Sequence, residues 1–470
     1  MSNLTADLGD FLANVRFESV PSEALPLVRD AFTDTIAVIM VGIDEPVVDI
    51  ARRTFIQQSA SREARACLSS VYVGAPEAAL IGGVAAHALD YDDQSLSGHP
   101  SAVMVPALLA EGEHLGSTGR ELVTAYVAGY EIWAELLRRS SNYHLKGWHP
   151  TSVFGAVGAA AATAVLNRLS AERAAAALAI AASHSGGLVA NFGTMTKPYH
   201  AGRAARDGLT ATRLAAAGMS AGADALENTQ GFLTAFSPDG KADRTSPARV
   251  GAEWFLLRQR LCIKKYPTCY FMHRSFDAAI RLLKARQVTA DQIAEIEVTM
   301  GKGQTNVLAN ERPQTGLEAK FSEQFAMAAA AILGHMDVED LTDAVVQRAD
   351  IQSFFPKVKL NPVDEYDTRD PAHSPTERVV IRLNSGDVLD SGAVALIRGH
   401  AYDPLSAEEL WDKFKNCTAR THTEGDAKKL FALLQSIETL PSVRALPTCN
   451  RIFLDKPAKT SLAAVGRGGG

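Results

Sequence analysis

Helix-length apolar segments that are dense in alanine and glycine dominate the first 260 residues of the chain. Residues 150–166 show the pattern most clearly, because Gly155 and Gly158 lead into an alanine run at 159–162. Small residues let helix backbones approach closely, and a helix that is apolar on every side is buried. The pattern therefore predicts a helical bundle. The expected helices are residues 26–42, 77–89, 103–115, 122–137, 150–166 and 171–182, with further small residues at Gly202, Ala205 and Gly208.

The pattern changes after about residue 265. Residues 293–300 alternate apolar and polar side chains as a half-buried strand does, and residues 322–333 have a helical pattern. Residues 378–383 and 388–396 flank Ser-Gly-Asp and predict a β-hairpin. We expect a mainly α fold with a large all-helical domain and a smaller α+β lid domain. The expected bounds are 1–265 for the helical domain, completed by amphipathic helix within 401–456, then 266–400 for the lid and 457–470 for a disordered tail.

Composition limits the classes of partner. The chain has 470 residues, and 47 Lys+Arg against 53 Asp+Glu give a net charge of −6, which argues against a nucleic-acid or anionic-membrane binder. No apolar run approaches the roughly 20 residues of a membrane span, and the N-terminus lacks the pattern of a signal peptide. The five cysteines are scattered without a CxxC pair, which fits a reducing compartment and gives no zinc signature. We expect a cytoplasmic protein.

Four segments place a cationic or titratable side chain beside a proline. Proline is favoured in the first turn of a helix, where free N–H groups and the helix dipole attract anions. If these helix starts converge, they form a site for a di- or tricarboxylate. The simpler interpretation of each segment is a helix start whose preceding side chain faces solvent. The segments are His99-Pro100, His149-Pro150, Lys197-Pro198 and Lys264-Lys265-Tyr266-Pro267.

Three carboxylates, Asp90, Asp92 and Asp93, follow an apolar helix shortly before His99. Carboxylates in this position can orient a histidine, act as bases or bind a metal. The pair Asp92-Asp93 is similar to the magnesium-binding aspartates of helical isoprenoid synthases, but Leu96 stands where that pattern needs an aspartate and no second acidic motif follows. Capping and turn formation is the simpler alternative.

Other candidates have simpler explanations. Cys269 has no marked base partner and is expected to be a buried small residue. His184 and His200 are typical of core histidines, although His200 stays among the expected substrate-binding residues. The glycine pairs at 82–83 and 186–187 match no phosphate-binding loop, so nucleotide chemistry is not expected.

The same segments resemble those of the MmgE/PrpD family, which includes 2-methylcitrate dehydratase, cis-aconitate decarboxylase and iminodisuccinate epimerase. The resemblance runs from about residue 10 to 440. It implies a large helical domain, a lid, a homodimer, and a cleft site without a metal or organic cofactor. The residues that match the family's site are Asp90, His99, His149, Lys197 and Lys264. The segments that carry the resemblance are 87–93 with 99–101, 147–151, 195–198 with 200–202, 264–269 with His273, and 319–325.

Two positions depart from the pattern of the decarboxylases that the chain resembles. Those enzymes carry a tyrosine where this chain has Phe325, and a threonine is usual where it has Gln94. The loop from Asp93 to His99 is also short beside theirs. These departures weaken a direct transfer of decarboxylase activity.

The reactions of the family share a carbanion or enolate next to a carboxylate, which fixed cations stabilise. We expect His149 and His99 as the acid–base pair, Asp90 as their orienter, and Lys197 and Lys264 as carboxylate binders. His99, Tyr266 and His200 complete the expected substrate-binding set.

The leading expectation from the sequence is a 2-methylcitrate dehydratase-like hydro-lyase acting on a small polycarboxylate. The alternatives within the family are a cis-aconitate decarboxylase-like or an iminodisuccinate epimerase-like activity. From other classes, a magnesium-dependent helical synthase and a non-catalytic carboxylate binder stay open.

Overall fold

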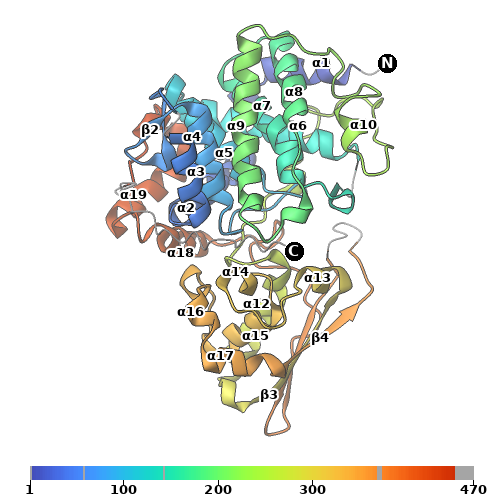
Figure 1. Ribbon diagram of the computed structural model, residues 1–470, viewed down its shortest axis with the longest axis vertical. Helices are drawn as coiled ribbons and strands as arrows, with labels where there is room; N and C mark the ends of the chain where they lie inside the picture. Colours follow the sequence, from blue (N-terminus) through green and yellow to red (C-terminus); the bar gives the residue numbers. More distant parts are fainter. Residues whose placement is uncertain (1–2, 57–58, 141–142, 368–372, 450–470) are drawn as a thin grey trace, which may run out of the picture.

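The computed structural model describes residues 3–56, 59–140, 143–367 and 373–449, and these form two lobes stacked along the long axis of the molecule (Figure 1). We call them the helical lobe and the small lobe. Each has its own hydrophobic core: one runs from Leu4 to Leu261 and resumes at Phe414, and the other runs from Tyr266 to Leu389. The expected tail at 457–470 lies outside the described residues.

The helical lobe contains the predicted helices, several of them extended by two or three residues at the N-terminus. The C-terminal helix α18 returns to this lobe after the small lobe and packs against α2. The longer helices are α1 (Leu4–Asn14), α2 (Ala24–Gly42), α3 (Pro46–Ile56), α4 (Ala75–His87), α5 (Pro100–Leu115), α6 (Gly119–Leu137), α7 (Pro150–Leu166), α8 (Ala171–His184), α9 (Thr196–Ala216), α18 (Ala407–Thr418) and α19 (Glu424–Leu434). The short elements are α10 (Phe232–Phe236), α11 (Phe255–Gln259), β1 (Ala64–Arg65) and β2 (Tyr72–Val73).

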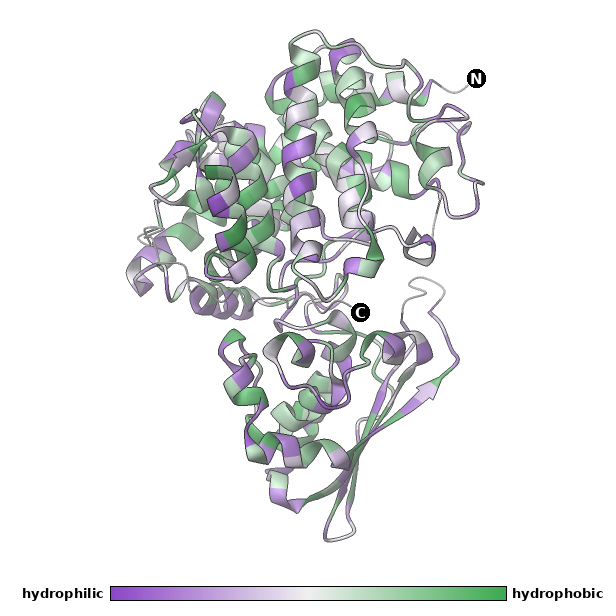
Figure 2. Ribbon diagram, in the orientation of Figure 1, coloured by the Kyte–Doolittle hydropathy of each residue, from purple (hydrophilic) through white to green (hydrophobic). Residues whose placement is uncertain are grey.

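Glycine and alanine set the spacing of the central helices α4, α7 and α9. A Cβ atom at Gly208 on α9 would lie only 2.5 Å from the backbone oxygen of Ala156 on α7. Atoms cannot approach so closely, so the two backbones touch only because the side chain is missing. The close packing predicted from the small residues is therefore confirmed. Figure 2 shows hydrophobic residues concentrated along the group formed by α2, α3, α4 and α5.

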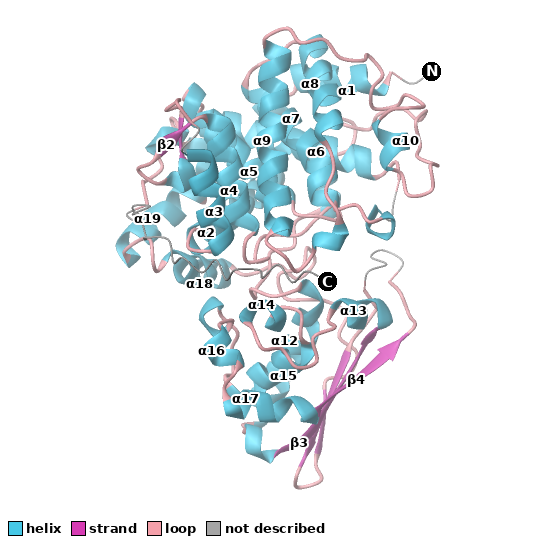
Figure 3. Ribbon diagram, viewed as in Figure 1, coloured by secondary structure: helices cyan, strands magenta, loops and turns pink. Residues whose placement is uncertain are grey.

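The small lobe packs helices against a four-stranded sheet of order β4-β3-β5-β6, whose strands lie along one side in Figure 3. β3 (Ile293–Gly301) pairs in parallel with β4 (Val358–Val363) and antiparallel with β5 (Arg378–Leu383), which forms a hairpin with β6 (Val388–Asp390). The predicted strand, hairpin and helix are confirmed, although β6 is shorter than expected. The helices are α12 (His273–Arg286), α13 (Lys302–Val307), α14 (Gly316–Ala319), α15 (Glu323–Ile332), α16 (Asp343–Val346) and α17 (Ala349–Phe354).

The fold is mainly α, as predicted, with the strands of the main sheet confined to the small lobe. The strand β4 was not predicted, because it contains Pro362 and proline disfavours a strand. The proline is tolerated here because β4 lies at the edge of the sheet. Within the described part of the chain, no helix combines the length and the apolar character needed to cross a bilayer.

Candidate active site

The end of α4 and the starts of α5, α7 and α9 meet at the face of the helical lobe that looks toward the small lobe. His99 and His149 are the N-cap residues of α5 and α7, as their prolines predicted. The ring of His87, the last residue of α4, lies 4.4 Å from the ring of His99 and 6.0 Å from that of His149. Lys197 lies in the first turn of α9. Three of the four predicted helix starts therefore converge.

The fourth segment differs from the prediction, because no helix opens at Pro267. After a short 3-10 turn, α12 begins only at His273. Lys264 nevertheless reaches the site from this irregular segment, and its Nζ donates to the backbone oxygen of Asp90 at 2.6 Å. The tertiary contact, rather than a helix start, positions this lysine.

Asp90 lies between two ammonium groups. Its carboxylate is 2.7 Å from Lys197 Nζ and 3.2 Å from Lys264 Nζ. Burial would raise the pKa of Asp90, but Lys197 and Lys264, with His99 and His87, lower it well below its usual range. The backbone of Asp90 is left-handed, with φ +54°, a conformation that aspartate tolerates better than most residues. Asp90 is therefore a fixed anion that holds both lysines.

Asp92 is the carboxylate closest to the rings of His87 and His99. Its carboxylate lies 3.0 Å from His87 Nδ1 and 2.9 Å from His99 Nδ1, whereas Asp90 lies 3.8 Å from His99 Nε2. Burial would raise the pKa of Asp92, but His87 and His99 lower it well below its usual range. His99 Nδ1 also lies 2.8 Å from the backbone oxygen of Asp93. Asp92 is therefore closer to both imidazoles than Asp90 is, and the orienting role expected of Asp90 stays a prediction.

Asp93 behaves differently from the two carboxylates before it. Burial and the nearby Asp34 raise the pKa of Asp93 well above its usual range. Its side chain accepts a hydrogen bond from Ser101, whose hydroxyl also lies 2.7 Å from that of Tyr126. Asp93 is therefore a neutral acid in the core, and its role is structural.

His149 and His200 form a neutral pair. Their Nδ1 atoms are 3.1 Å apart, and the edge of the Phe192 ring packs on His149. Burial, helped by His87 and Lys197, lowers the pKa of His149 well below its usual range, and burial lowers the pKa of His200 to about 4. At neutral pH His149 is unprotonated, so it can act as a base but not as a cationic acid.

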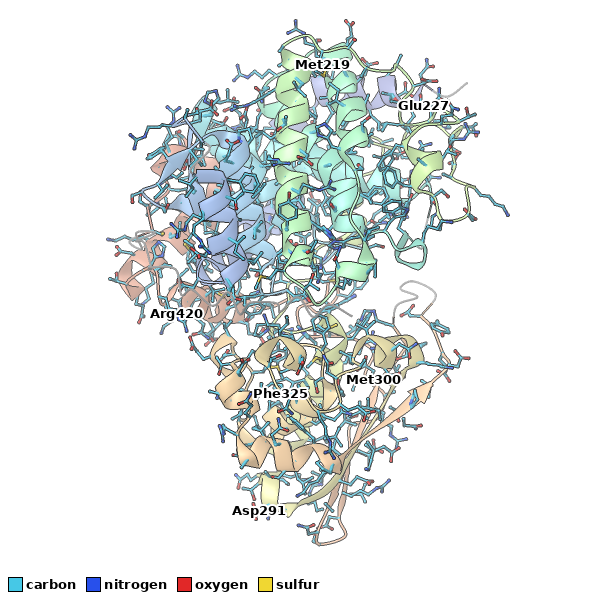
Figure 4. All side chains as sticks on the ribbon, in the orientation of Figure 1. Met219, Glu227, Asp291, Met300, Phe325 and Arg420 are labelled. Carbon is cyan, nitrogen blue, oxygen red and sulfur yellow. The ribbon has the colours of Figure 1, made fainter. Side chains whose placement is uncertain are left out.

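A cleft of about 340 Å³ lies between the lobes beside these groups. His87, Asp90 and Lys197 form its wall on the helical lobe, and Lys320 faces them from the small lobe. His99, His149, His200 and Lys264 lie behind this wall. Figure 4 shows Arg420, another lining residue, at the boundary between the lobes.

Lys320 is the site cation that the sequence reasoning did not single out. It lies between α14 and α15, and its Nζ donates to the backbone oxygen of Leu89 at 3.1 Å. Burial, opposed by Glu45 and Asp90, lowers the pKa of Lys320 to about 8. It belongs to the segment 319–325 that carried the family resemblance, but no neighbouring proline or acidic cluster indicated that it belongs to the site.

Tyr266 lies outside this cleft, contrary to the expected substrate contact. Its hydroxyl donates to Asp277 at 2.6 Å, and its ring lines a separate cavity of about 420 Å³ with Lys265 and Arg398. Lys264 therefore contacts Asp90 behind the cleft, whereas Tyr266, two residues later, lines a different cavity.

Two models of a known protein family match the chain. The MmgE/PrpD N-terminal domain model matches residues 6–245, and the MmgE/PrpD C-terminal domain model matches residues 266–439. The protein belongs to the MmgE/PrpD family. It is similar to cis-aconitate decarboxylase of Homo sapiens, at 29% identity over 81% of this chain and 82% of that protein, and of Mus musculus, at 30% over 78% and 77%. It is also 24% identical to cis-aconitate decarboxylase of Aspergillus terreus, over 95% of both chains.

A metal is a poor fit to the acidic cluster of this MmgE/PrpD protein. Among the described residues, His87, Asp90, Asp92 and His99 each offer a ligand atom within 4.8 Å of the others. The charge of Asp90 is already paired by two ammonium groups, and a divalent cation beside them would be repelled. This chemistry speaks against the magnesium-dependent synthase alternative.

The two positions that depart from the decarboxylase pattern do not line the cleft. Phe325 is fully buried in the core of the small lobe. Gln94 pairs through its backbone with Cys262 and lines another cavity. In this MmgE/PrpD protein neither side chain is therefore placed to contact a ligand in the cleft.

Proposed function

We propose that this MmgE/PrpD protein is a lyase that removes CO₂ from cis-aconitate or a closely similar tricarboxylate. The observation that carries the proposal is a set of three buried ammonium groups: Lys197 and Lys320 line one cleft, and Lys264 pairs with Asp90 behind its wall. Such a site binds a small polyanion. The similarity to cis-aconitate decarboxylases over most of both chains supports this activity ahead of the dehydratase expected from sequence.

The reaction needs cations and one proton. The bond between the CH₂ carbon of cis-aconitate and its carboxylate breaks, and CO₂ leaves. The electron pair spreads across the double bond to the carbon beside the far carboxylate, which then takes a proton. The product is a dicarboxylate with a terminal methylene. Lys197 and Lys264, held by Asp90, lie where they can stabilise the developing negative charge.

The neutral His149 supports one second candidate, a 2-methylcitrate dehydratase-like reaction. Dehydration needs a base to remove a proton and an acid to help the hydroxyl leave. His149 is unprotonated at neutral pH and therefore suits the base. Decarboxylation has no such requirement, so removing this imidazole separates the two reactions.

Proton NMR in D₂O with cis-aconitate, 2-methylcitrate and an amino-dicarboxylate tests the proposal. We expect CO₂ release from cis-aconitate and a methylene product with deuterium on its saturated carbon. Water loss from 2-methylcitrate without CO₂ release would identify a dehydratase, and deuterium wash-in with loss of stereochemistry would identify an epimerase. Thermal stabilisation by every acid without chemical change would identify a non-catalytic binder.

Substitutions at Lys197 and His149 test the role of each residue in the reaction. Lys197→Ala should lower kcat/KM by roughly two orders of magnitude, because it removes a cation from the site. His149→Ala should abolish a dehydratase but leave a decarboxylase with measurable turnover. Lys302→Ala, on the exposed surface of the small lobe, is the control. Excess chelator should leave the rate unchanged.

A further inference from the structure

Lys320 is bound differently from the other two lysines of the site. Lys197 and Lys264 are ion-paired to Asp90, whereas Lys320 donates to a neutral acceptor, the backbone oxygen of Leu89. An ammonium group has three N–H donors. The contact with Leu89 fixes the direction of the side chain. Lys320 also lines the cleft, so a ligand in the cleft can reach its ammonium group.

The charges around Lys320 set its proton affinity. It is buried, with 7% of its surface exposed, in a cleft between the lobes. Burial is the largest influence and lowers its pKa to about 8, with Glu45 and Asp90 opposing and Lys264 and Lys197 assisting. A general acid works best when its pKa lies near the working pH, because it is then both protonated and able to release the proton. Charged groups that line the cleft with Lys320 are Glu45, Asp90, Lys197, Glu339 and Arg420.

Three of the four site histidines are less suited to give a proton at neutral pH. Low pKa values keep His87, His149 and His200 in their neutral forms. His99 does not line the cleft, and its Nδ1 contacts the backbone oxygen of Asp93 at 2.8 Å and the carboxylate of Asp92 at 2.9 Å. Of the groups that line the cleft, Lys320 therefore combines access with a readily released proton.

We propose that Lys320 is the proton donor of the reaction, delivering the proton to the carbon that carries the electron pair after CO₂ departs. The N–H bond of the ammonium breaks, the electron pair of the carbanion forms the C–H bond, and the neutral amine regains its proton from water. This role rests on the proposed lyase function. Because Lys320 belongs to the small lobe, this role makes the small lobe necessary for turnover.

Lys320→Arg and Lys320→Met separate charge from proton transfer. A guanidinium keeps the positive charge but does not release a proton in proteins. We expect Lys320→Arg to keep KM within a few-fold while kcat falls by about 10²- to 10⁴-fold, the usual contribution of a general acid. Lys320→Met should lose kcat and also raise KM. Lys357→Met is the matched control, because Lys357 also donates to a backbone oxygen in the small lobe, that of Ile293, but lines no part of this cleft.

The pH profile gives a second readout that lost packing would not change. The acid form of Lys320 is the active one, so the wild-type kcat should fall as the pH rises through about 8. This alkaline limb should be absent from both Lys320 variants and present in Lys357→Met. A Lys320→Arg enzyme with wild-type kcat, or with the same alkaline limb, would overturn the assignment.

The outcomes also separate this role from the proposed function. If the wild-type protein binds cis-aconitate in calorimetry but converts none of it, the lyase function fails, and the proton donor fails with it. If the wild-type protein releases CO₂ and Lys320→Arg is equally fast, only the role of Lys320 fails.

Discussion

In the helical lobe, α4, α7 and α9 meet through glycine and alanine, whereas in the small lobe the sheet meets α12 and α15 through Phe, Ile, Val and Met side chains. The first kind of contact allows almost no change in helix spacing, because backbone touches backbone. It holds the carboxylates, the histidines and Lys197 in one fixed array. The small lobe adds one site lysine on the segment between two helices. The helical lobe therefore supplies a rigid array of site residues, and the small lobe supplies one further lysine, Lys320.

The contacts that anchor the site loops to α18 in the helical lobe give the largest expected effect. Lys413 on α18 is buried, donates to the backbone oxygens of Tyr91 and Lys264 at 2.8 Å, and pairs with Asp34. Lys413→Met leaves the carboxylate of Asp34 buried without its cation, which costs about 3–5 kcal/mol of unfolding free energy. Both loops that carry site charges also lose their anchor, so kcat/KM should fall.

Urea unfolding and turnover measure both consequences. Lys415→Met changes an exposed lysine of the same helix and should leave both quantities near the wild-type values. Equal stability of the Lys413 and Lys415 variants would show that the contacts of Lys413 do not stabilise the loops that carry the site residues.

Removing volume should damage the small lobe. Phe325 is fully buried among the large side chains of its core, and Phe325→Ala should cost about 3–5 kcal/mol. Val388→Ala, at a side chain 54% exposed on β6, should cost little. Urea unfolding of both variants is the measurement, and a tolerant Phe325→Ala would contradict the contrast between the two cores.

Adding volume should damage the helical lobe. Gly208→Ala places a methyl group against the backbone of α7 and should cost about 1–3 kcal/mol. The exposed Gly222 has room for a Cβ, with its nearest neighbouring atom 3.7 Å away, so Gly222→Ala should be neutral or stabilising. Thermal unfolding of the pair tests the helix spacing, and equal midpoints would argue against contact between the backbones.

The smallest effect, taken over a single pH unit, is a difference in pH dependence. Burial raises the pKa of Glu323 in the small lobe to about 8, so its contribution to stability is complete below about pH 4.5 and is lost as the pH rises through 8. Burial lowers the pKa of His87 and His200 in the helical lobe to about 4, so their contribution is present above about pH 6.5 and is lost as the pH falls toward 4. The contribution of Glu323 and that of the two histidines therefore respond to pH in opposite directions.

Glu323→Gln isolates the first half of this contrast. The variant should lack a slope in unfolding free energy of at most about 1.4 kcal/mol per pH unit between pH 4.5 and 8. Urea unfolding across this range is the measurement. The idea fails if wild type and variant keep parallel pH profiles.

Local patterns predicted most of the helices and part of the site. Proline placed His99 and His149 at helix starts, and the small residues predicted the contact between α7 and α9. The pairing of β3 with β4 depends on residues far apart in the sequence, and no local pattern carries it.

The roles of the three aspartates could not be read from the sequence in the same way. Asp90, Asp92 and Asp93 are nearly adjacent, yet one holds lysines, one holds histidines and one is a neutral acid. Their neighbours come from α2, α5, α9 and the segment before Tyr266, so only tertiary structure separates them. Lys320 was missed for the same reason, since Leu89 and Glu45, which hold and surround it, lie far from it in the sequence.

The return of α18 to the helical lobe also affects how the protein is made. Asp34 is translated near the start of the chain and Lys413 near the end, and the whole small lobe lies between them. Domains commonly fold in order as they leave the ribosome. Here the lobe that begins first is completed last, and the array of charges is anchored only after the small lobe has emerged.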